Sequence, residues 1–520
     1  MIHLTNKNKI ILVLALAVIT CLTAFKSLKK NDPHKAPNII LIVADDLGYS
    51  DLSSYGNKLI QTPNIDALGR EGIRFTQAYV TSPICGPSRI GLLTGRYQQR
   101  FGDEFMPYDH YEPAFMKNLR SHYGSLKKSI PGLKTMKPDF FVNREKFNDG
   151  LPATEMTIAD LLKQKGYATG LIGKWNLGGG TNYYPDQHGY DYSYYFEGAL
   201  TRYVDDPVDT GRYINQHLPW SFSEAVAWAP RYGSTAIREN RTVVKDTGYL
   251  TFSLASRAVD FIDKHKDSSF FLTLTFNAPH DPFQVPKEYF NRVNNRVTDT
   301  LHRVYFGMIE AMDAAVGMVM KKLNDERLDK NTIIFFLSDN GGATYTRATT
   351  NAPLRGGKCT HFDGGLMVPF FIKYPGVFQN NKIYNSPVSS LDIFTTIAAV
   401  ANTSLPSDRV YDGVNLLRYV TGEKDSLPHT LFYWRNGYSQ AIRNGDWKLY
   451  VNKKNKKTYL FNLASDIGEL HDLSKQYPAK VNELKQQLQQ WENTQFIKPR
   501  WKSGADVLIN VDGEVVWFPT

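Results

Sequence analysis

The stretch NIILIVADD, residues 38–46, places an unbroken apolar run directly before two aspartates. A short apolar run without polar alternation is typical of a strand buried on both faces, as in a parallel sheet covered by helices. Three further runs have this character, at residues 168–173 (ATGLIG), 270–276 (FFLTLTF) and 332–337 (TIIFFL). The sequence therefore predicts four central strands of a mostly parallel sheet.

Helical patterns lie between these runs and make the fold α/β. Apolar residues recur at helical spacing in residues 64–71, in 156–165 after Thr154 as a candidate cap, and in 305–323. After about residue 404 the pattern changes to short alternating stretches at 440–451 and 457–463, followed by a helix at 478–492. This pattern predicts a smaller C-terminal α+β domain with an antiparallel sheet.

Polar side chains follow every predicted central strand. They are Asp45 and Asp46, Lys174 and Asn176, Asn277 and His280, and Asp339 and Asn340. Ligands of open parallel sheets bind beyond the carboxyl ends of the strands, so these groups are expected to form one site. Two of the four sets offer only oxygen ligands, which favour Ca²⁺ or Mg²⁺ over zinc.

Cys85 lies in the segment SPICGPSR, residues 82–89. Pro87 suits the first turn of a helix, because its missing N–H would have no partner there. Cys85 would then lie at a helix N-terminus, where free N–H groups favour an anion. Arg89 follows one turn later and can reach the same anion.

Composition limits the classes of partner. The chain has 520 residues, of which 42% are hydrophobic, and a formal net charge of +10. This charge fits an ordinary basic surface as well as attraction of an anionic substrate. We find no zinc-finger spacing, RNA-binding aromatic motif or basic heptad region, so a nucleic-acid partner is not expected.

The N-terminus has the pattern of an export signal. Lys7 and Lys9 precede an apolar run at residues 10–19, which is shorter than the roughly 20 residues of a membrane span. We therefore expect a signal peptide in residues 1–25, no integral membrane span, and a periplasmic, cell-surface or secreted protein. Cys21 could be lipidated instead. Only Cys85 and Cys359 remain beyond it, so at most one disulfide is expected.

The motif CGPSR (85–89), with TGRY (94–97) behind it, resembles the formylglycine-dependent (type I) sulfatases of the alkaline phosphatase superfamily. The resemblance extends over nearly all of the chain from Pro37 onward. The other motifs are DDLG (45–48), TPNID (62–66), GKW (173–175), NAPH (277–280), SDNGG (338–342), PLRGGK (353–358), DGVN (412–415) and RNGDWK (443–448).

The resemblance implies an alkaline-phosphatase-like sandwich, with a catalytic domain at 37–403 and the smaller domain at 404–520. It also implies hydrolysis of sulfate esters. Similar secreted bacterial enzymes act on algal polysaccharides such as ulvan or carrageenan, or on glycosaminoglycans. The implied cofactor is Ca²⁺ rather than Mg²⁺. A maturation enzyme would oxidise Cys85 to formylglycine (3-oxoalanine).

The family motifs also imply a role for each site residue. Hydrated formylglycine at residue 85 would attack sulfur, and Arg89 would hold that residue in place. The predicted metal ligands are Asp45, Asp46, Asp339, Asn340 and the modified residue 85. Lys174 and Lys358 would bind sulfate oxygens, and His280 would protonate the leaving alcohol.

Two positions depart from the family pattern. Asn176 stands where the family usually has a histidine base, and an amide cannot accept a proton at neutral pH. Asp363 stands where the family usually has glutamate. His361 is a candidate substitute base or substrate contact close to Lys358. A phosphodiesterase or phosphonate hydrolase of the same superfamily, and a polyanion-binding protein that has lost activity, remain as alternatives.

The stretch around residues 202–238 is rich in arginine. Arg202, Tyr203, Arg212, Arg231 and Arg238 could line sugar subsites, since arginine pairs with sulfates and uronates. The same residues could equally belong to an ordinary surface.

Overall fold

The structure is a computed structural model that describes residues 36–107, 149–205, 211–221, 223, 224, 228, 231–293 and 296–520. Residues 37–520 form one compact unit. The predicted signal peptide (1–25) and Cys21 lie outside the described residues. None of the helices in the described ranges combines the length and the apolar character that a membrane crossing requires.

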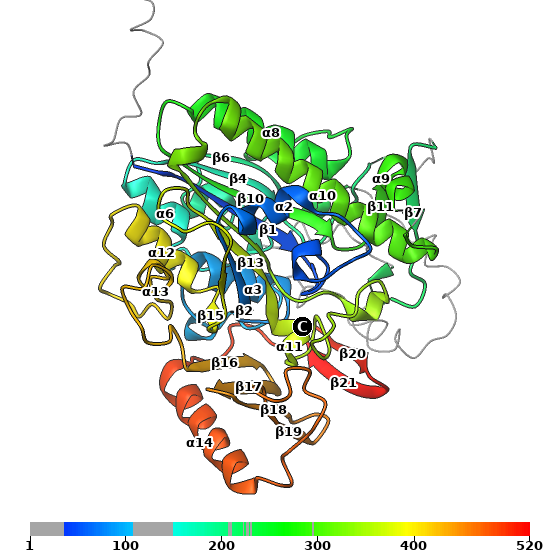
Figure 1. Cartoon of the computed structure of the whole chain (residues 1–520), viewed down its shortest axis with the longest axis vertical. Helices are drawn as coiled ribbons and strands as arrows, with labels where there is room; N and C mark the ends of the chain where they lie inside the picture. Colours follow the sequence, from blue (N-terminus) through cyan, green and yellow to red (C-terminus); the bar gives the residue numbers. More distant parts are fainter. Residues whose placement is uncertain are drawn as a thin grey trace, which may run out of the picture. The chain divides into compact units, whose positions relative to one another are not determined.

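A large mixed sheet forms the centre of this unit (Figure 1). Its strand order is β14-β2-β13-β12-β1-β10-β4-β6-β8-β9, and β15 pairs with β2. The four predicted strands are β12 (Thr332–Ser338), β1 (Asn38–Asp45), β10 (Phe270–Pro279) and β4 (Ala168–Lys174). They are consecutive neighbours in the sheet and all pair in parallel, which confirms the prediction.

The remaining strands complete the sheet on both sides. They are β2 (Ile73–Tyr79), β6 (Tyr192–Phe196), β8 (Arg238–Glu239), β9 (Thr242–Val243), β13 (Met367–Lys373), β14 (Lys382–Tyr384) and β15 (Val388–Ser389). β6 is parallel to β4, whereas β13 is antiparallel to both β12 and β2. The sequence analysis did not predict β13 or β2, and a local apolar pattern does not give the direction of a strand, which depends on the connections.

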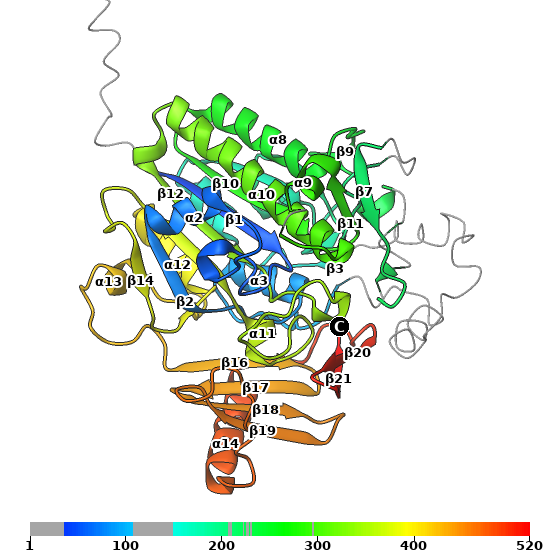
Figure 2. The ribbon, with the colours of Figure 1, turned by 45° about the vertical axis from the view of Figure 1, so that its right-hand side comes forward.

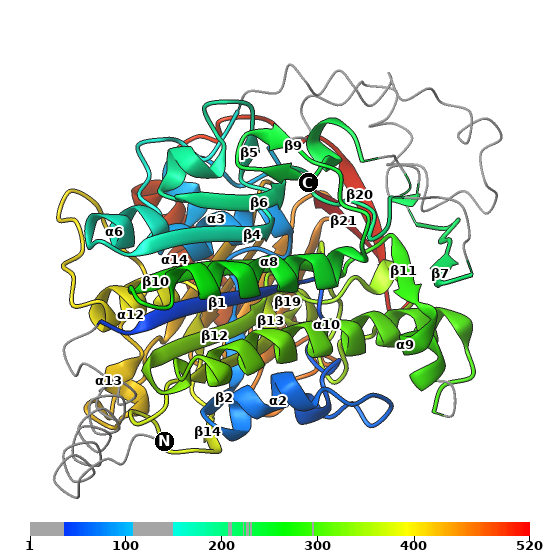
Figure 3. The same ribbon diagram turned by 90° about the horizontal axis from the view of Figure 1, so that it is seen from above.

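Strand β1 separates two apolar layers because alternate side chains of a strand point to opposite faces. Ile40, Ile42 and Ala44 belong to one cluster, and Ile39, Leu41 and Val43 belong to the other. The first layer contains residues of α2 (Pro63–Arg70), α8 (Leu250–His265) and α10 (Thr300–Asp325), and the second contains residues of α3 (Cys85–Thr94), α6 (Ile158–Gln164) and α12 (Asp392–Val400). Figure 3 shows α8 and α10 crossing one face of the sheet.

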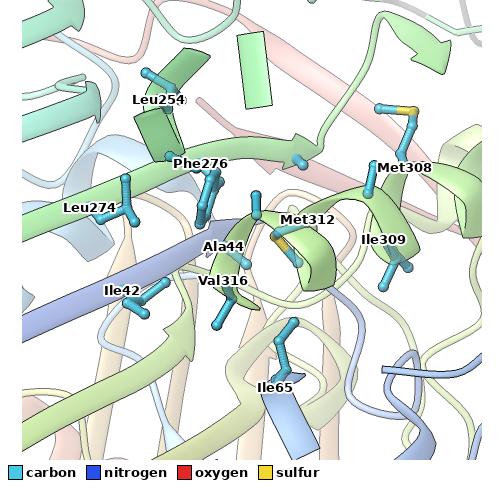
Figure 4. Packing of buried hydrophobic residues seen from close by; sticks show 14 of the residues in the cluster. Ile42, Ala44, Ile65, Leu254, Leu274, Phe276, Met308, Ile309, Met312 and Val316 are labelled. Atoms are coloured by element: carbon cyan, nitrogen blue, oxygen red, sulfur yellow. The ribbon is translucent and has the colours of Figure 1, made fainter. Parts of the chain in front are cut away.

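The contact between α10 and the sheet is wholly apolar at its centre. Figure 4 shows Met312 and Val316 of α10 beside Ile42 and Ala44 of β1, with Phe276 of β10 next to them. This packing fixes the strands whose ends carry the predicted site.

The predicted helices occur as α2, α6 and α10. The start of α6 differs from the expectation, because Thr157 and not Thr154 is the N-cap. The Thr157 side chain accepts a hydrogen bond from the Asp160 amide, and the Asp160 carboxylate accepts one from the Thr157 amide. This reciprocal capping box satisfies two amides of the first turn.

The C-terminal part has the predicted antiparallel sheet (Figure 2). β16 (Leu431–Asn436), β17 (Ser439–Asn444), β18 (Trp447–Asn452) and β19 (Lys457–Asn462) pair in sequence order, and α14 (Pro478–Gln495) packs on them. The short remaining elements are β3 (Asp149–Gly150), β5 (Gly178–Gly179), β7 (Tyr213–Gln216), α9 (Lys287–Arg292), β11 (Phe283–Pro286), α11 (Asp363–Leu366), α13 (Leu417–Val420), β20 (Asp506–Val511) and β21 (Glu514–Pro519). The division of the chain at residues 403 and 404 stays a prediction.

A buried charge network joins the C-terminal sheet to α11. Lys448 Nζ of β18 lies 2.5 Å from Asp363 Oδ1 and 2.8 Å from Glu469 Oε1, and all three side chains are fully buried. Burial raises the pKa of the Glu469 carboxyl, although Lys448 opposes this effect. Asp363, which departs from the family pattern, is therefore the carboxylate that receives Lys448.

Replacing Lys448 with Met should destabilise the protein by about 3–5 kcal/mol, because two buried carboxylates would lose their cation. Lys457→Met, on the neighbouring strand, is the matched control. Lys457 is half-exposed and lies 3.4 Å from Glu514, so its loss should cost about 0–1 kcal/mol. Denaturant unfolding measures both variants, and equal effects would contradict a structural role for the network.

Candidate active site

The four central strands bring the predicted site residues together at their carboxyl ends. Asp45 ends β1, Lys174 ends β4, and Asp339 follows β12 directly. Strand β10 runs three residues beyond its predicted end and includes Asn277, with His280 immediately after it. These side chains are almost completely buried.

Cys85 is the first residue of α3, as the sequence predicts. Its Sγ lies 3.5 Å from Asp45 Oδ1. A Cβ atom on the next residue, Gly86, would lie 3.1 Å from Met106 Sδ and 3.3 Å from the backbone oxygen of Asn176. Glycine thus lets the start of the helix approach the turn that carries Asn176.

Arg89 connects three of the strand ends. Its Nε donates to Asp339 Oδ2 at 2.8 Å, and its Nη1 donates to the Lys174 backbone oxygen at 3.1 Å. Nη2 lies 3.8 Å from Asp45 Oδ1. Burial would raise the pKa of the Asp339 carboxyl, but Arg89 and Lys174 outweigh burial and lower it.

The two aspartates of the DDLG motif each face a lysine. Lys174 Nζ donates to both carboxylate oxygens of Asp45, at 2.9 and 2.7 Å. Lys358 Nζ donates to Asp46 Oδ2 at 2.9 Å, and Asn340 Nδ2 donates to Asp46 Oδ1 at 2.7 Å. Asp46 has a φ of 62°, a left-handed conformation that aspartate and asparagine adopt more readily than other residues with a side chain.

The His280 ring lies between a lysine and two aspartates. Nδ1 lies 2.6 Å from the Asp281 backbone oxygen and 2.8 Å from Asp281 Oδ1. Because a carbonyl only accepts, Nδ1 carries the proton, and Nε2 faces Lys358 Nζ at 3.0 Å. Burial and Lys358 would lower the pKa of the ring, but the surrounding carboxylates raise it well above its ordinary value.

The loop that carries His280 has its own supports. The Tyr203 hydroxyl lies 2.6 Å from the Asn277 backbone oxygen and 2.9 Å from that of His280. Ser223 Oγ donates to Asp281 Oδ2. The sequence reasoning did not single out Asp281 or Ser223. The adjacency of Asp281 to His280 was a visible signal, whereas nothing near Ser223 in the sequence pointed to the site.

Several buried polar atoms at this end of the sheet have no partner among the described residues. They are both amide atoms of Asn176, both amide atoms of Asn277, and Asn340 Oδ1. A buried polar atom without a hydrogen bond costs free energy, so these groups are suited to bind a ligand.

A cluster of site residues could hold a divalent cation. Ligand atoms of Asp45, Asp46, Cys85 and His280 all lie within 4.8 Å of one another. The unpartnered Asn340 Oδ1 adds a neutral oxygen ligand. Oxygen donors of this kind suit a hard cation.

The structure does not bring His361 to this cluster. Its Nδ1 lies 2.9 Å from Ser439 Oγ and its Nε2 lies 3.2 Å from Asn436 Oδ1, both in the C-terminal sheet. Burial lowers the pKa of His361 to about 3. The expected roles as a base or a substrate contact are therefore not supported by its position. Cys85 and Cys359 are both free thiols.

Two side chains of the arginine-rich stretch make structural contacts. Arg231 is buried and donates to the backbone oxygens of Arg202 and Tyr203. Arg238 pairs with Glu197 at 2.6 Å. Since the guanidinium groups of Arg231 and Arg238 bind protein atoms, we do not assign these two residues to sugar subsites.

Comparison with known proteins identifies the family of this chain. The model of the Sulfatase family matches residues 37–403. The chain belongs to the sulfatase family. The steryl-sulfatase of Rattus norvegicus is 31% identical over 490 residues, covering 82% of this chain and 78% of that protein. Membership makes this sulfatase a sulfuric ester hydrolase.

Solved structures agree with the family. The structure of Ps i-CgsB in complex with k-i-k-neocarrahexaose matches with a TM-score of 0.74 at 32% identity, covering 90% of this chain and 95% of that chain. The phosphonate monoester hydrolase of Agrobacterium radiobacter matches with a TM-score of 0.60 at 19% identity, covering 88% and 96%. The alkaline-phosphatase-like fold predicted from the sequence is confirmed.

Proposed function

We propose that this sulfatase removes sulfate from a sulfated polysaccharide or its oligosaccharides, with formylglycine at residue 85 and Ca²⁺ in the site. One observation carries the mechanism: the thiol of Cys85 lies at the start of α3, beside Asp45 and among three buried cations. Sulfate is an anion that becomes more negative at the leaving oxygen during cleavage, and such an arrangement stabilises it.

Asp45, Asp46, Asp339, Asn340 and residue 85 would hold the cation. When bound, Ca²⁺ would offset the negative charge of the sulfate. One hydroxyl of hydrated formylglycine would attack sulfur and lose its proton to the carboxylate of Asp45, whose Oδ1 lies 3.5 Å from Cys85 Sγ. In the described structure Lys174, Lys358 and Arg89 balance the three carboxylates. A bound cation would neutralise these carboxylates in place of the lysines. The ammonium groups of Lys174 and Lys358 could then bind sulfate oxygens.

His280 would move the protons of the reaction. Its ring is oriented through Nδ1 by Asp281, so Nε2 is the nitrogen that faces the cluster. As the S–O bond of the ester breaks, Nε2–H would donate its proton to the leaving alcohol oxygen. The neutral ring would then accept the proton of the remaining hydroxyl on residue 85, which releases sulfate and restores the aldehyde.

Asn176 would bind and orient but would not transfer a proton. Both atoms of its buried amide lack partners among the described residues, so they are available to the hydrated residue 85 or to sulfate. This assignment accounts for the missing histidine without a substitute base, since His280 acts in both steps.

The substrate class rests on chemistry and on relatives. A net charge of +10 is compatible with an anionic polymer, and the 32%-identical Ps i-CgsB was solved with k-i-k-neocarrahexaose. Carrageenan oligosaccharides are therefore the first substrates to test, followed by ulvan and glycosaminoglycans. We also propose that the protein is exported, which would give it access to such polymers. A formylglycine-generating enzyme would modify Cys85. The alternatives of a phosphodiesterase and of an inactive polyanion-binding protein are separated by the first experiment below.

Protein produced with a maturation enzyme should show, in the peptide containing residue 85, the mass loss for conversion of a thiol to an aldehyde. It should hydrolyse an aryl sulfate much faster than an aryl phosphodiester, and Cys85→Ala should abolish turnover. Cys359→Ala, which removes the other described cysteine, should keep both properties. Full activity of unmodified protein, or preference for the phosphodiester, would overturn the proposal.

Removal of the cation with a chelator should abolish turnover. Ca²⁺ should restore turnover better than Zn²⁺, because the ligand atoms of the proposed aspartates and asparagine are oxygens. Ca²⁺ should also raise the melting temperature, since a ligand stabilises the state that binds it. Asp339→Ala should lose both effects, whereas Asp329→Ala, just before the opposite end of β12, should keep them. A Ca²⁺ response that survives in Asp339→Ala would show that the ion binds elsewhere.

His280→Ala should lower turnover by about 10²–10⁴-fold, the usual contribution of general acid–base catalysis. Asn176→Ala should cost less, because it removes positioning and not proton transfer, and His361→Gln should affect stability more than turnover. Single-turnover and steady-state kinetics separate the two chemical steps. The roles are wrong if Asn176→Ala is as inactive as Cys85→Ala while His280→Ala stays near normal.

A further inference from the structure

We propose that Arg347 and Trp220 form a second anion-binding subsite beside the active site, which takes a sulfate or carboxylate group on the saccharide that leaves. The inference rests on the proposed function and concerns how the same site recognises its substrate. The evidence is the contact between the two side chains and the proximity in the chain of each residue to residues at or next to the active site.

Arg347 is exposed, and the centre of its guanidinium lies 4.7 Å from the centroid of the Trp220 ring. Within the described ranges, no carboxylate pairs with it and its side chain makes no hydrogen bond. The guanidinium is therefore held by the aromatic ring, and none of its five N–H donors is used by a described residue. An arginine that only stabilised the fold would be expected to use some of these donors.

The backbone also holds Arg347 in a defined position. It follows the short helix η9 (Thr344–Thr346) with a φ of 64°, and its amide donates to the Thr344 backbone oxygen at 2.9 Å. A left-handed conformation is unusual for arginine, and residues in such conformations concentrate at functional sites. The turn thus presents the side chain from a fixed point.

Each member of the pair lies close in the chain to an active-site residue. Helix η9 begins four residues after Asn340, and Tyr345 within it is near enough to Lys358 and Asp46 for their charges to affect its hydroxyl. On the other side, Trp220 precedes Ser221, whose hydroxyl lies 2.7 Å from that of Ser223. Ser223 contacts Asp281, the residue that orients His280.

Through these contacts the pair connects to the loop that carries His280, and we infer that it borders the side of the site where His280 would protonate the leaving alcohol. A saccharide released by that step must occupy this side. A guanidinium binds a sulfate or carboxylate with two parallel hydrogen bonds, which a lysine cannot reproduce. The buried indole N–H of Trp220 has no acceptor among the described residues and adds a donor nearby.

The test compares Arg347→Asn and Arg347→Lys with Arg327→Asn. Asparagine tolerates the left-handed conformation, so the loss variant keeps the turn. Arg327 is the matched control, because it is also exposed and has a φ of 59°, but it follows α10 near the start of β12, at the opposite end of the sheet. Substrates are 4-nitrophenyl sulfate, a monosulfated oligosaccharide, a disulfated oligosaccharide, and a monosulfated one containing a uronate.

Arg347→Asn should raise KM about 10-fold to 100-fold for substrates with a second anion, the scale of a lost charged hydrogen bond. It should leave kcat, and both constants for the other two substrates, close to wild type. Arg347→Lys should recover only part of the loss, and Arg327→Asn should change nothing. The response of the disulfated against the uronate substrate identifies which anion the subsite takes.

Equal effects of Arg347→Asn on all four substrates, or no effect on any, would overturn the subsite. If the wild-type enzyme turned over no sulfate ester, the proposed function would fail instead. Titration calorimetry of the disulfated oligosaccharide into the wild type and Arg347→Asn would then still decide the subsite, since tighter binding by the wild type supports it and equal binding contradicts it.

Discussion

The burial of like charges at one end of the parallel sheet is the constraint on which the rest of this structure depends. Asp45, Asp46 and Asp339 lie almost without solvent contact at adjacent strand ends. Taking such carboxylates out of water is costly unless cations compensate them. Arg89 comes from a helix, Lys174 from a neighbouring strand and Lys358 from a loop, so these three elements must assemble around the strand ends. The same arrangement that stabilises the carboxylates also suits a divalent cation and a sulfate.

Two other polar systems hold this arrangement in place. The buried Lys448, Asp363 and Glu469 join the C-terminal sheet to α11, and α11 follows the loop that carries Lys358. The second system supports His280 through Tyr203 and Asp281. Both systems use residues far from the site in the sequence. The C-terminal sheet therefore contacts the segment next to the Lys358 loop, although none of its residues belongs to the proposed site.

The departure at Asn176 bears on how the proposed mechanism distributes its proton transfers. An amide keeps donors and an acceptor at this position but cannot take a proton. Among the described histidines, His280 is the one that lies at the carboxylate cluster, and its Nε2 faces Lys358. The histidine at 361 is already committed to the C-terminal sheet. In the proposed mechanism one histidine therefore serves both proton transfers.

The sequence by itself determined the local features: the four apolar strands, the polar residues after them, the helix beginning at Cys85, and the antiparallel C-terminal strands. Each depends on neighbouring residues, so a short pattern is sufficient to predict it. Only the tertiary structure decided the antiparallel placement of β13 and the contact of His361 with Ser439. The same is true of the contact of Ser223 with Asp281 beside His280, and of the contact of Arg347 with Trp220. These features join residues that are distant in the chain. Their partners are chosen by how strands and loops pack, which no local pattern records.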